Sequence, residues 1–223
     1  QVTSHFSFLR GASSPEELFA AAAQLGHQAL GLCDWNSVAG VVRGWSSQKS
    51  SGVRLIAGAR VDLVDGPSLL RYPRCRAAWS RPTRLLSLGK GRGGKGRCIL
   101  GWSDVAAHAE EMIAIHVPDM PDERTAQHLR DLCQLFGKRG FCALSFRRRP
   151  DDMQRLHQLD ALAGSAGVRS VATGDILYHS SERRPLQDVV SAIRQGCTID
   201  ALGFQRERFM DRHLKSPAEM ERR

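Results

Sequence analysis

Three histidines and one aspartate are the side chains whose types and positions could bind a metal ion. His5, His116 and His179 lie near the ends of segments with the pattern of strands, and Asp175 ends another such segment. Neutral imidazoles and carboxylates are ordinary ligands of metal ions in proteins. A metal site built from these four groups is therefore one hypothesis. The alternative is that each histidine forms a structural hydrogen bond, which is the commoner role for a single histidine.

A second chemical feature is a concentration of positive charge. The formal net charge is +9, and the stretch between Asp65 and Asp104 contains no acidic residue but nine basic ones. They are Arg71, Arg74, Arg76, Arg81, Arg84, Lys90, Arg92, Lys95 and Arg97. A basic stretch is typical of a protein that binds a polyanion such as nucleic acid, although a solvated loop has the same composition.

Within this stretch, the segment GKGRGGKGR at residues 89–97 is expected to form a mobile basic loop. Five of its nine residues are glycine, and glycine leaves the backbone with great conformational freedom. Such a loop can bring its cations to phosphate groups without strain. The predicted nucleic-acid-binding residues are therefore Lys90, Arg92, Lys95 and Arg97.

Apolar segments of strand length alternate with helical patterns along the chain. Strands are predicted at residues 2–8, 29–34, 53–63, 68–72, 112–117, 141–146 and 168–175, and helices at residues 13–26 and 152–167. The first helix has a serine cap, Pro15 in its first turn and Gly26 at its end, which are standard boundary signals. The alternation predicts an α/β fold with a mostly parallel sheet or a barrel, in a single domain.

The rest of the composition excludes several classes of protein. The six cysteines are widely spaced and form no CxxC unit, so neither a zinc site nor a redox motif is expected. No apolar run approaches the roughly 20 residues that span a bilayer, and the first residues are unlike a signal peptide. We therefore expect a soluble, cytoplasmic protein. Because the chain begins at Gln1, we also expect an upstream segment to be missing.

Several motifs give the chain a resemblance to a known family. HFSFLRGAS begins at His5, DWNSVAG at Asp34, GARVDLVDGPSLL at Gly58 and ERRPLQDV at Glu182. With these motifs the chain resembles the N-terminal PHP domain of bacterial error-prone C-family DNA polymerases, which are similar to DNA polymerase III alpha and of the translesion type. The resemblance implies an α/β fold, a distorted PHP-type (β/α) barrel in a single domain over residues 1–223. It also implies that the extreme N-terminus is missing and that the chain ends where the polymerase palm would begin.

The resemblance also places the metal ligands of active PHP domains, which hold three metal ions with histidines and carboxylates. The corresponding positions in this chain are Gln1, Thr3, Arg10, Trp35, Arg60, Asp175 and Leu177. Only Asp175 keeps a side chain that can bind a metal, and Arg10 and Arg60 would repel one. We therefore expect a vestigial site with no metal and no catalytic residue, in which an ion pair between Arg60 and Asp175 is one possible replacement.

The function implied by the resemblance is that of a non-catalytic PHP-like scaffold in an error-prone DNA polymerase that acts in translesion synthesis and the response to DNA damage. The parent enzyme would be a DNA-directed nucleotidyltransferase that uses Mg²⁺, whereas no cofactor is expected for this chain. The expected partners are DNA, the palm and thumb domains of the same polymerase, and other translesion or replication proteins, with no membrane. Two alternatives remain open: an active metal-dependent phosphoesterase or proofreading exonuclease, and a stand-alone basic nucleic-acid-binding module.

Overall fold

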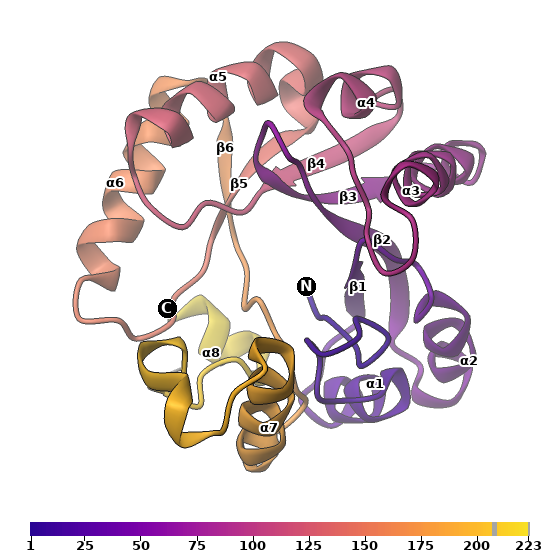
Figure 1. Ribbon diagram of the computed structural model, residues 1–223, viewed down its shortest axis with the longest axis vertical. Helices are drawn as coiled ribbons and strands as arrows, with labels where there is room; N and C mark the ends of the chain where they lie inside the picture. Colours follow the sequence, from indigo (N-terminus) through magenta and orange to yellow (C-terminus); the bar gives the residue numbers. More distant parts are fainter. Residues whose placement is uncertain (207–208, 223) are drawn as a thin grey trace. The chain divides into compact units, whose positions relative to one another are not determined.

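The computed structural model describes residues 1–206 and 209–222 and divides into two compact units. The first unit contains Gln1–Ala57, Phe146–Arg149 and Gly174–Arg223, and the second contains Gly58–Ser145 and Pro150–Thr173. Six strands are hydrogen-bonded in the order β1-β2-β3-β4-β5-β6. With the intervening helices (Figure 1), they confirm the predicted α/β class. The prediction of a single domain stays a prediction.

The first unit contains the two ends of the described chain. Its elements are α1 (Pro15–Gln24), β1 (Ala29–Trp35), α2 (Val41–Ser51), the start of β2 (Arg54–Asp62), the 3₁₀ turn Ser181–Arg183, α7 (Arg184–Gln195), the 3₁₀ segment Asp200–Gln205 and α8 (Pro217–Glu221). Helix α1 begins as predicted, because Ser14 Oγ accepts a hydrogen bond from Glu17 N at 3.1 Å while Glu17 Oε2 accepts one from Ser14 N at 2.9 Å. This capping box satisfies two backbone donors at the start of the helix.

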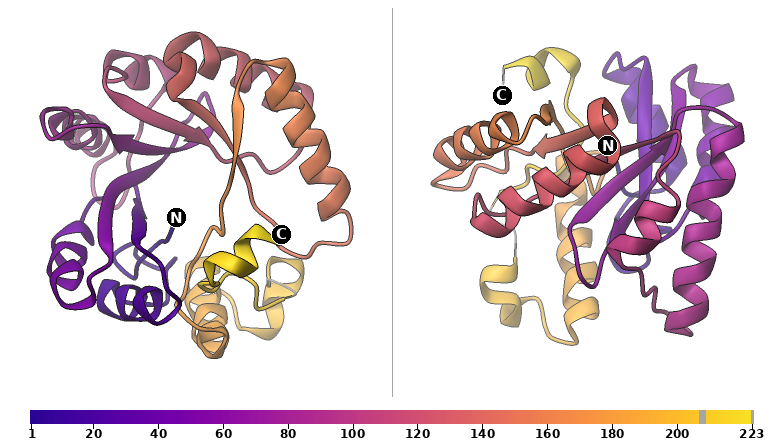
Figure 2. Two further views of the ribbon diagram at one scale, coloured as in Figure 1. Left: turned by 180° about the vertical axis from the view of Figure 1, so that it is seen from behind. Right: turned by 90° about the horizontal axis from the view of Figure 1, so that it is seen from above.

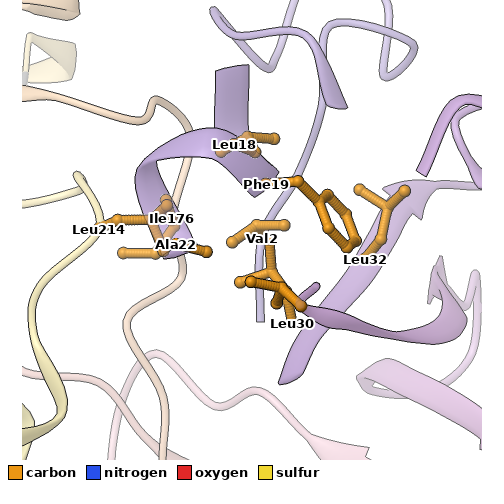
Figure 3. Close-up of a cluster of buried hydrophobic side chains, with 9 residues drawn as sticks. Val2, Leu18, Phe19, Ala22, Leu30, Leu32, Ile176 and Leu214 are labelled. Carbon is orange, nitrogen blue, oxygen red and sulfur yellow. The ribbon is translucent and has the colours of Figure 1, made fainter. Parts of the chain in front are cut away.

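A cluster of buried apolar side chains holds the first unit together (Figure 3). Phe19 and Leu18 of α1 pack with Leu32 of β1 and with Val2 and Ile176, and all five have at most 3% of their surface exposed. Val2 forms parallel bridges to both Leu32 and Ile176. Segments that are distant in the sequence therefore meet at Val2. The two bridges of Val2 determine where the chain runs after this residue.

The predicted strand at residues 2–8 is wrong apart from Val2. After this bridge the chain turns, because Ser7 N donates to Ser4 O at 2.9 Å and Arg10 N donates to Ser7 O at 2.9 Å. The hydroxyl groups of both serines bind Asp34. In addition, Phe6 N donates to Ser4 Oγ at 3.2 Å, and local side-chain hydrogen bonds of that kind compete with strand pairing. The alternating pattern of the sequence did not reveal these contacts.

The second unit contains most of the sheet. Its elements are β2 from Gly58, β3 (Ser68–Pro73), the 3₁₀ turn Ala77–Trp79, α3 (Ser80–Gly93), α4 (Trp102–Ala107), β4 (Met112–His116), α5 (Glu123–Phe136), the 3₁₀ turn Gly137–Arg139, β5 (Gly140–Leu144), α6 (Asp152–Ser165) and β6 (Arg169–Ala172). Helices α5 and α6 lie side by side against β4 and β5 (Figure 2). The predicted helix at 152–167 and the five strands predicted from residue 53 onward are present.

The sheet is mixed rather than mostly parallel. Strand β3 is antiparallel to both β2 and β4, whereas β5 is parallel to both β4 and β6. A short connection, residues 63–67, joins β2 to β3 and permits an antiparallel hairpin. The alternation of strands and helices predicted the α/β class but not the direction of β3.

Candidate functional site: an arginine-lined pocket

Asp34 at the end of β1 is the polar anchor of the site in the first unit. Its carboxylate is 1% exposed and accepts hydrogen bonds from Ser4 N at 2.9 Å, Ser7 Oγ at 2.8 Å and Gly40 N at 3.1 Å. Burial raises the pKa of Asp34, and the hydrogen bonds from the serines and Gly40 oppose that shift. These hydrogen bonds connect the HFSFLRGAS motif to the DWNSVAG motif and hold the backbones of both motifs in place.

Arg10 and Trp35, two of the predicted vestigial positions, are in direct contact. The Arg10 guanidinium carbon lies 3.9 Å from the centre of the Trp35 ring, which is cation–π geometry. Trp35 N donates to Ser7 Oγ at 2.8 Å, so the same serine positions both Asp34 and the indole. At two positions where the resemblance expects metal ligands, the chain therefore has an aromatic ring beneath a permanent positive charge.

Asp175, the one competent ligand among the vestigial positions, is paired with two arginines. Its Oδ2 accepts from Arg147 Nη2 at 2.5 Å and from Arg212 Nη2 at 2.6 Å, and its side chain is 2% exposed. Gln1 Nε2 donates to Oδ1 at 3.4 Å. Charge-assisted hydrogen bonds of this kind are among the strong ones, so two guanidinium groups offset the charge of Asp175; neither Arg147 nor Arg212 was predicted as its partner.

Thr3 and Leu177 are buried parts of the same unit. Thr3 Oγ1 donates to the Cys33 carbonyl oxygen at 3.3 Å. Leu177 is 4% exposed and packs with Ala12 and Tyr178. Thr3 therefore supports the backbone of β1, and Leu177 contributes to apolar packing.

Arg60 is the one predicted vestigial position in the second unit. It lies on β2, is 8% exposed, and its Nε donates to Ser68 Oγ at 2.8 Å. Ser68 Oγ in turn donates to Asp62 Oδ1 at 2.7 Å. The ion pair between Arg60 and Asp175 stays a prediction.

A second buried carboxylate on α7 escaped the sequence analysis. Asp188 Oδ1 accepts from Arg184 Nε at 2.7 Å, and its Oδ2 accepts from Arg206 Nε at 2.9 Å. Arg184 also donates through Nη1 to the Phe209 carbonyl oxygen at 2.9 Å. The four-residue spacing of Arg184 and Asp188 could have indicated a helical ion pair, whereas nothing in the sequence pointed to Arg206.

Some of these residues line a pocket of about 120 Å³ in the first unit. Three predicted vestigial positions, Arg10, Trp35 and Leu177, line it together with one face of α7 and Arg212. The residues contributed by α7 are Gln187, Asp188, Ser191 and Arg194. The predicted positions therefore form part of the pocket wall, and the part formed by α7 was not predicted.

The side chains at this pocket do not fit a metal cluster. Asp175 and Asp188 each bind two guanidinium groups, and a metal ion would have to displace these hydrogen-bonded cations. Within the described ranges 1–206 and 209–222, no group of three or more His, Cys, Asp or Glu side chains is arranged to hold a metal ion. The donor set favours anions over cations.

The histidines of the alternative metal site take part in other contacts. His179 Nδ1 lies 2.8 Å from Ser13 Oγ, which also accepts from His179 N at 3.0 Å. In the second unit, His116 Nδ1 lies 3.4 Å from the Ser68 carbonyl oxygen. The exposed His5 packs its ring against Phe6. The environments of His116 and His179 therefore fit a structural hydrogen bond, which was the alternative to a metal site.

The predicted basic loop is shorter than expected. Residues 89–93 form the last turn of α3, and only residues 94–97 of the segment follow the helix. Tertiary packing overrides the glycine content here, because Gly89 O accepts from Ile99 N at 2.9 Å and a Cβ at Gly89 would come within 2.7 Å of Leu100. Its mobility stays a prediction.

The four predicted nucleic-acid-binding cations are all exposed, but they are not equivalent. Arg92 Nη1 lies 2.6 Å from Asp104 Oδ2, and this hydrogen bond is the main cause of the lowered pKa of Asp104. Lys90, Lys95 and Arg97 have no such carboxylate partner in the part of the chain that the structure describes. These three are therefore the more available cations.

The chain has an α/β fold with a mixed six-stranded sheet. Its fold is similar to that of an amidohydrolase from Chromobacterium violaceum, with a TM-score of 0.62 and 15% identity over 79% of this chain and 86% of the other. The PHP domain family matches residues 1–142. The chain belongs to this family.

Curated relatives match the chain over its whole length. An "Error-prone DNA polymerase 2" from Agrobacterium fabrum is 53% identical over 222 residues, and a protein of the same name from Rhizobium meliloti is 54% identical. An "Error-prone DNA polymerase" from Caulobacter vibrioides is 46% identical over 224 residues. The match covers 100% of this chain but only about 20% of each of the first two polymerases. The chain is thus a PHP domain similar to one part of these enzymes.

No described helix is long and apolar enough to cross a membrane.

Proposed function

We propose that this chain is a non-catalytic PHP scaffold of an error-prone DNA polymerase that acts in translesion synthesis after DNA damage. The observation that carries the proposal is the pairing of Asp175 with Arg147 and Arg212. An active metal-dependent phosphoesterase would need this carboxylate for a metal ion, together with ligands where Trp35 and Leu177 now lie. The similarity to about a fifth of the length of error-prone DNA polymerases supports the polymerase context.

An exposed apolar stripe on α7 supports the scaffold role. Leu186, Val189 and Ile193 are 41%, 39% and 60% exposed and recur at helical spacing. Exposed apolar surface of this kind is typical of an interface. We assign it to the remainder of the polymerase, such as the palm and thumb, because the relatives are about five times longer than this chain.

The scaffold also provides contacts to DNA. Lys90, Lys95 and Arg97 near the end of α3 are exposed, so they can neutralise backbone phosphates without first breaking an ion pair. Arg92 is the weaker candidate because Asp104 already binds it.

Two measurements on the purified chain test the absence of catalysis. Metal content is determined after purification without a chelator, and hydrolysis is assayed with a generic phosphodiester and with a 3′-ended DNA strand in Mg²⁺, Mn²⁺ or Zn²⁺. We expect less than one equivalent of bound metal and no hydrolysis. Two or more equivalents, with hydrolysis that Asp175→Asn abolishes, would establish the phosphoesterase instead. The chain alone is also expected not to extend a primed template.

The interface is tested by binding of the chain to the remaining portion of the Agrobacterium fabrum polymerase. The double variant Leu186→Asp/Ile193→Asp should abolish binding, because each change places a charge in the apolar stripe. Val64→Asp is the matched control, since Val64 is 69% exposed and lies in the second unit. Equal binding by the double variant and by Val64→Asp would show that α7 is not part of the interface.

A further inference from the structure

Helix α2 of the first unit packs closely on the core and exposes a tryptophan. A Cβ added at Gly44 would lie 3.0 Å from Leu32 Cδ2 and 3.5 Å from Phe19 Cε2, so one face of the helix lies directly against the core. The next residue, Trp45, is 54% exposed. Aromatic side chains usually contribute to stability through burial, so packing within this unit does not account for an indole at this position.

The side chains near Trp45 on α2 are apolar or positively charged. Val42, three residues before Trp45, is 73% exposed. Lys49, four residues after it, has its Nζ 5.8 Å from the centre of the indole ring, which is within cation–π range. Arg43 forms an ion pair with Glu16 of α1 at 3.8 Å, with side chains 66% and 50% exposed, and an exposed pair of this kind is weak.

The sequence around α2 has no negative charge of its own. Between Asp34 and Asp62 there is no acidic residue, and the helix contains two cations, Arg43 and Lys49. Positive charge on an exposed face attracts polyanions. The chemistry of this face is therefore an aromatic ring beside two exposed cations.

The other polar residues of α2 favour nucleic acid over protein as the partner. Ser46 and Ser50 are exposed on the same helix, and serine and lysine are depleted in the cores of protein interfaces. Binding of a single strand requires an aromatic ring on which a base can stack and nearby cations that neutralise the phosphates. Trp45 and Lys49 provide both.

We propose that α2 binds single-stranded nucleic acid, with one base stacked on the Trp45 indole and neighbouring phosphates bound by Lys49 and Arg43. Four residues of helix separate Trp45 from Lys49 by about 6 Å along the axis, so the ammonium group can reach a phosphate next to the stacked base. A base in a duplex lies inside the stack, so this face should not contribute to duplex binding. The proposal concerns a different surface from the end of α3 and does not depend on the polymerase role.

The first test is quenching of the intrinsic fluorescence of the purified chain. Trp45 is exposed, whereas the other three tryptophans, Trp35, Trp79 and Trp102, are only partly exposed. An oligothymidylate of about ten nucleotides should quench the emission through stacking on the indole. Trp45→Phe should lose most of this quenching, and a duplex of the same length should cause little of it in the parent chain.

The second test is fluorescence anisotropy with a labelled oligothymidylate. Trp45→Ala should weaken binding by about fivefold or more, which is the effect of losing one base–aromatic stack. Lys49→Gln should flatten the dependence of log K on log salt concentration by about 0.7, the contribution of one phosphate contact to a single strand. Circular dichroism establishes that each variant is folded.

The matched controls lie in the second unit. Met153→Ala removes an apolar side chain that is 69% exposed on α6, and Lys138→Gln removes one exposed cation. Both should bind the oligothymidylate as the parent does. Equal binding by Trp45→Ala and Met153→Ala, or undiminished quenching in Trp45→Phe, would overturn the proposal and favour a protein partner for this face. Comparison with an oligouridylate of the same length then identifies DNA or RNA as the preferred strand.

Discussion

Arg212 binds Asp175 at two points, since its Nη2 donates to the carboxylate Oδ2 at 2.6 Å and its Nε donates to the backbone carbonyl oxygen at 2.9 Å. The side chain and the backbone of Asp175 are thus fixed by one guanidinium group. Asp175 has a φ of +44°, which is an uncommon conformation for a residue other than glycine. The interaction explains how the chain holds this conformation.

Asp175→Asn should destabilise the first unit by about 3 kcal/mol or more, because it removes the charge of a buried carboxylate that two largely buried arginines bind. Asparagine tolerates a positive φ, so the substitution isolates the loss of charge. Urea unfolding at pH 7 measures the change. The control is Glu16→Gln, which removes an exposed ion pair with Arg43 at 3.8 Å and should cost at most about 1 kcal/mol. Similar costs for the two variants would contradict a structural role for Asp175.

Gly40→Ala should destabilise the protein by about 1–3 kcal/mol, because a Cβ there must displace its neighbours. It would lie 2.3 Å from Asp34 Oδ2 and 2.8 Å from Ser4 Oγ. Thermal unfolding monitors the effect. Gly91→Ala is the control, since this exposed glycine of α3 has nothing within 4 Å of an added Cβ. It should be stabilising by about 0.5–1 kcal/mol, and the opposite order of the two variants would refute the anchor at Asp34.

Features that neighbouring residues determine could be predicted from the sequence, whereas features that depend on distant contacts could not. Helix α1 was predictable because Ser14, Pro15 and Glu17 specify its start within four residues. The strand at residues 2–8 was predicted wrongly because Ser4 and Ser7 bind Asp34, which is 27 to 30 residues away. Side-chain contacts over that separation leave no periodic trace in one sequence.

The candidate site shows the same limit. The family resemblance identified Arg10, Trp35 and Leu177, and all three line the pocket. It could not identify the partners of Asp175, because Arg147 and Arg212 are separated from it by 28 and 37 residues. Loss of the metal ligands stays a prediction from residue types, whereas the arginines around Asp175 could be identified only from the fold.

His116 should make the stability of the second unit depend on pH. The pKa of His116 is lowered from its usual value of 6.5 to about 4, mainly by burial; the hydrogen bond to Ser68 and the charge of Asp122 oppose this shift, whereas the neighbouring His128 contributes to it. As the pH falls from 6.5 to 4 the unfolded chain takes up a proton before the folded one does, so stability falls over this window. The loss is on the order of 3 kcal/mol.

The measurement is urea unfolding at pH 7 and at pH 4 for the protein and for His116→Asn. The variant should lose less stability than the parent between these two values, since asparagine does not titrate. His157→Gln is the control, because His157 is exposed on α6 in the same unit. An identical pH dependence in the parent and in His116→Asn would show that His116 remains able to protonate in the folded state.

Exposed cations near the end of α3 should set the salt dependence of DNA binding. The triple variant Lys90→Gln/Lys95→Gln/Arg97→Gln should weaken binding to duplex DNA of any sequence, because each of these side chains can neutralise one phosphate. Each contact contributes a slope of about −0.9 to the dependence of log K on log salt concentration, so the triple variant should flatten the slope by up to about 3 units. Adding Arg92→Gln should change the slope little, since Asp104 already binds Arg92 at 2.6 Å.

Fluorescence anisotropy over a series of salt concentrations gives the slopes. The control is Arg43→Gln/Lys49→Gln/Arg54→Gln, which removes the same charge from exposed positions in the first unit. If the control flattens the slope as much as the triple variant does, net charge and not the end of α3 determines DNA binding.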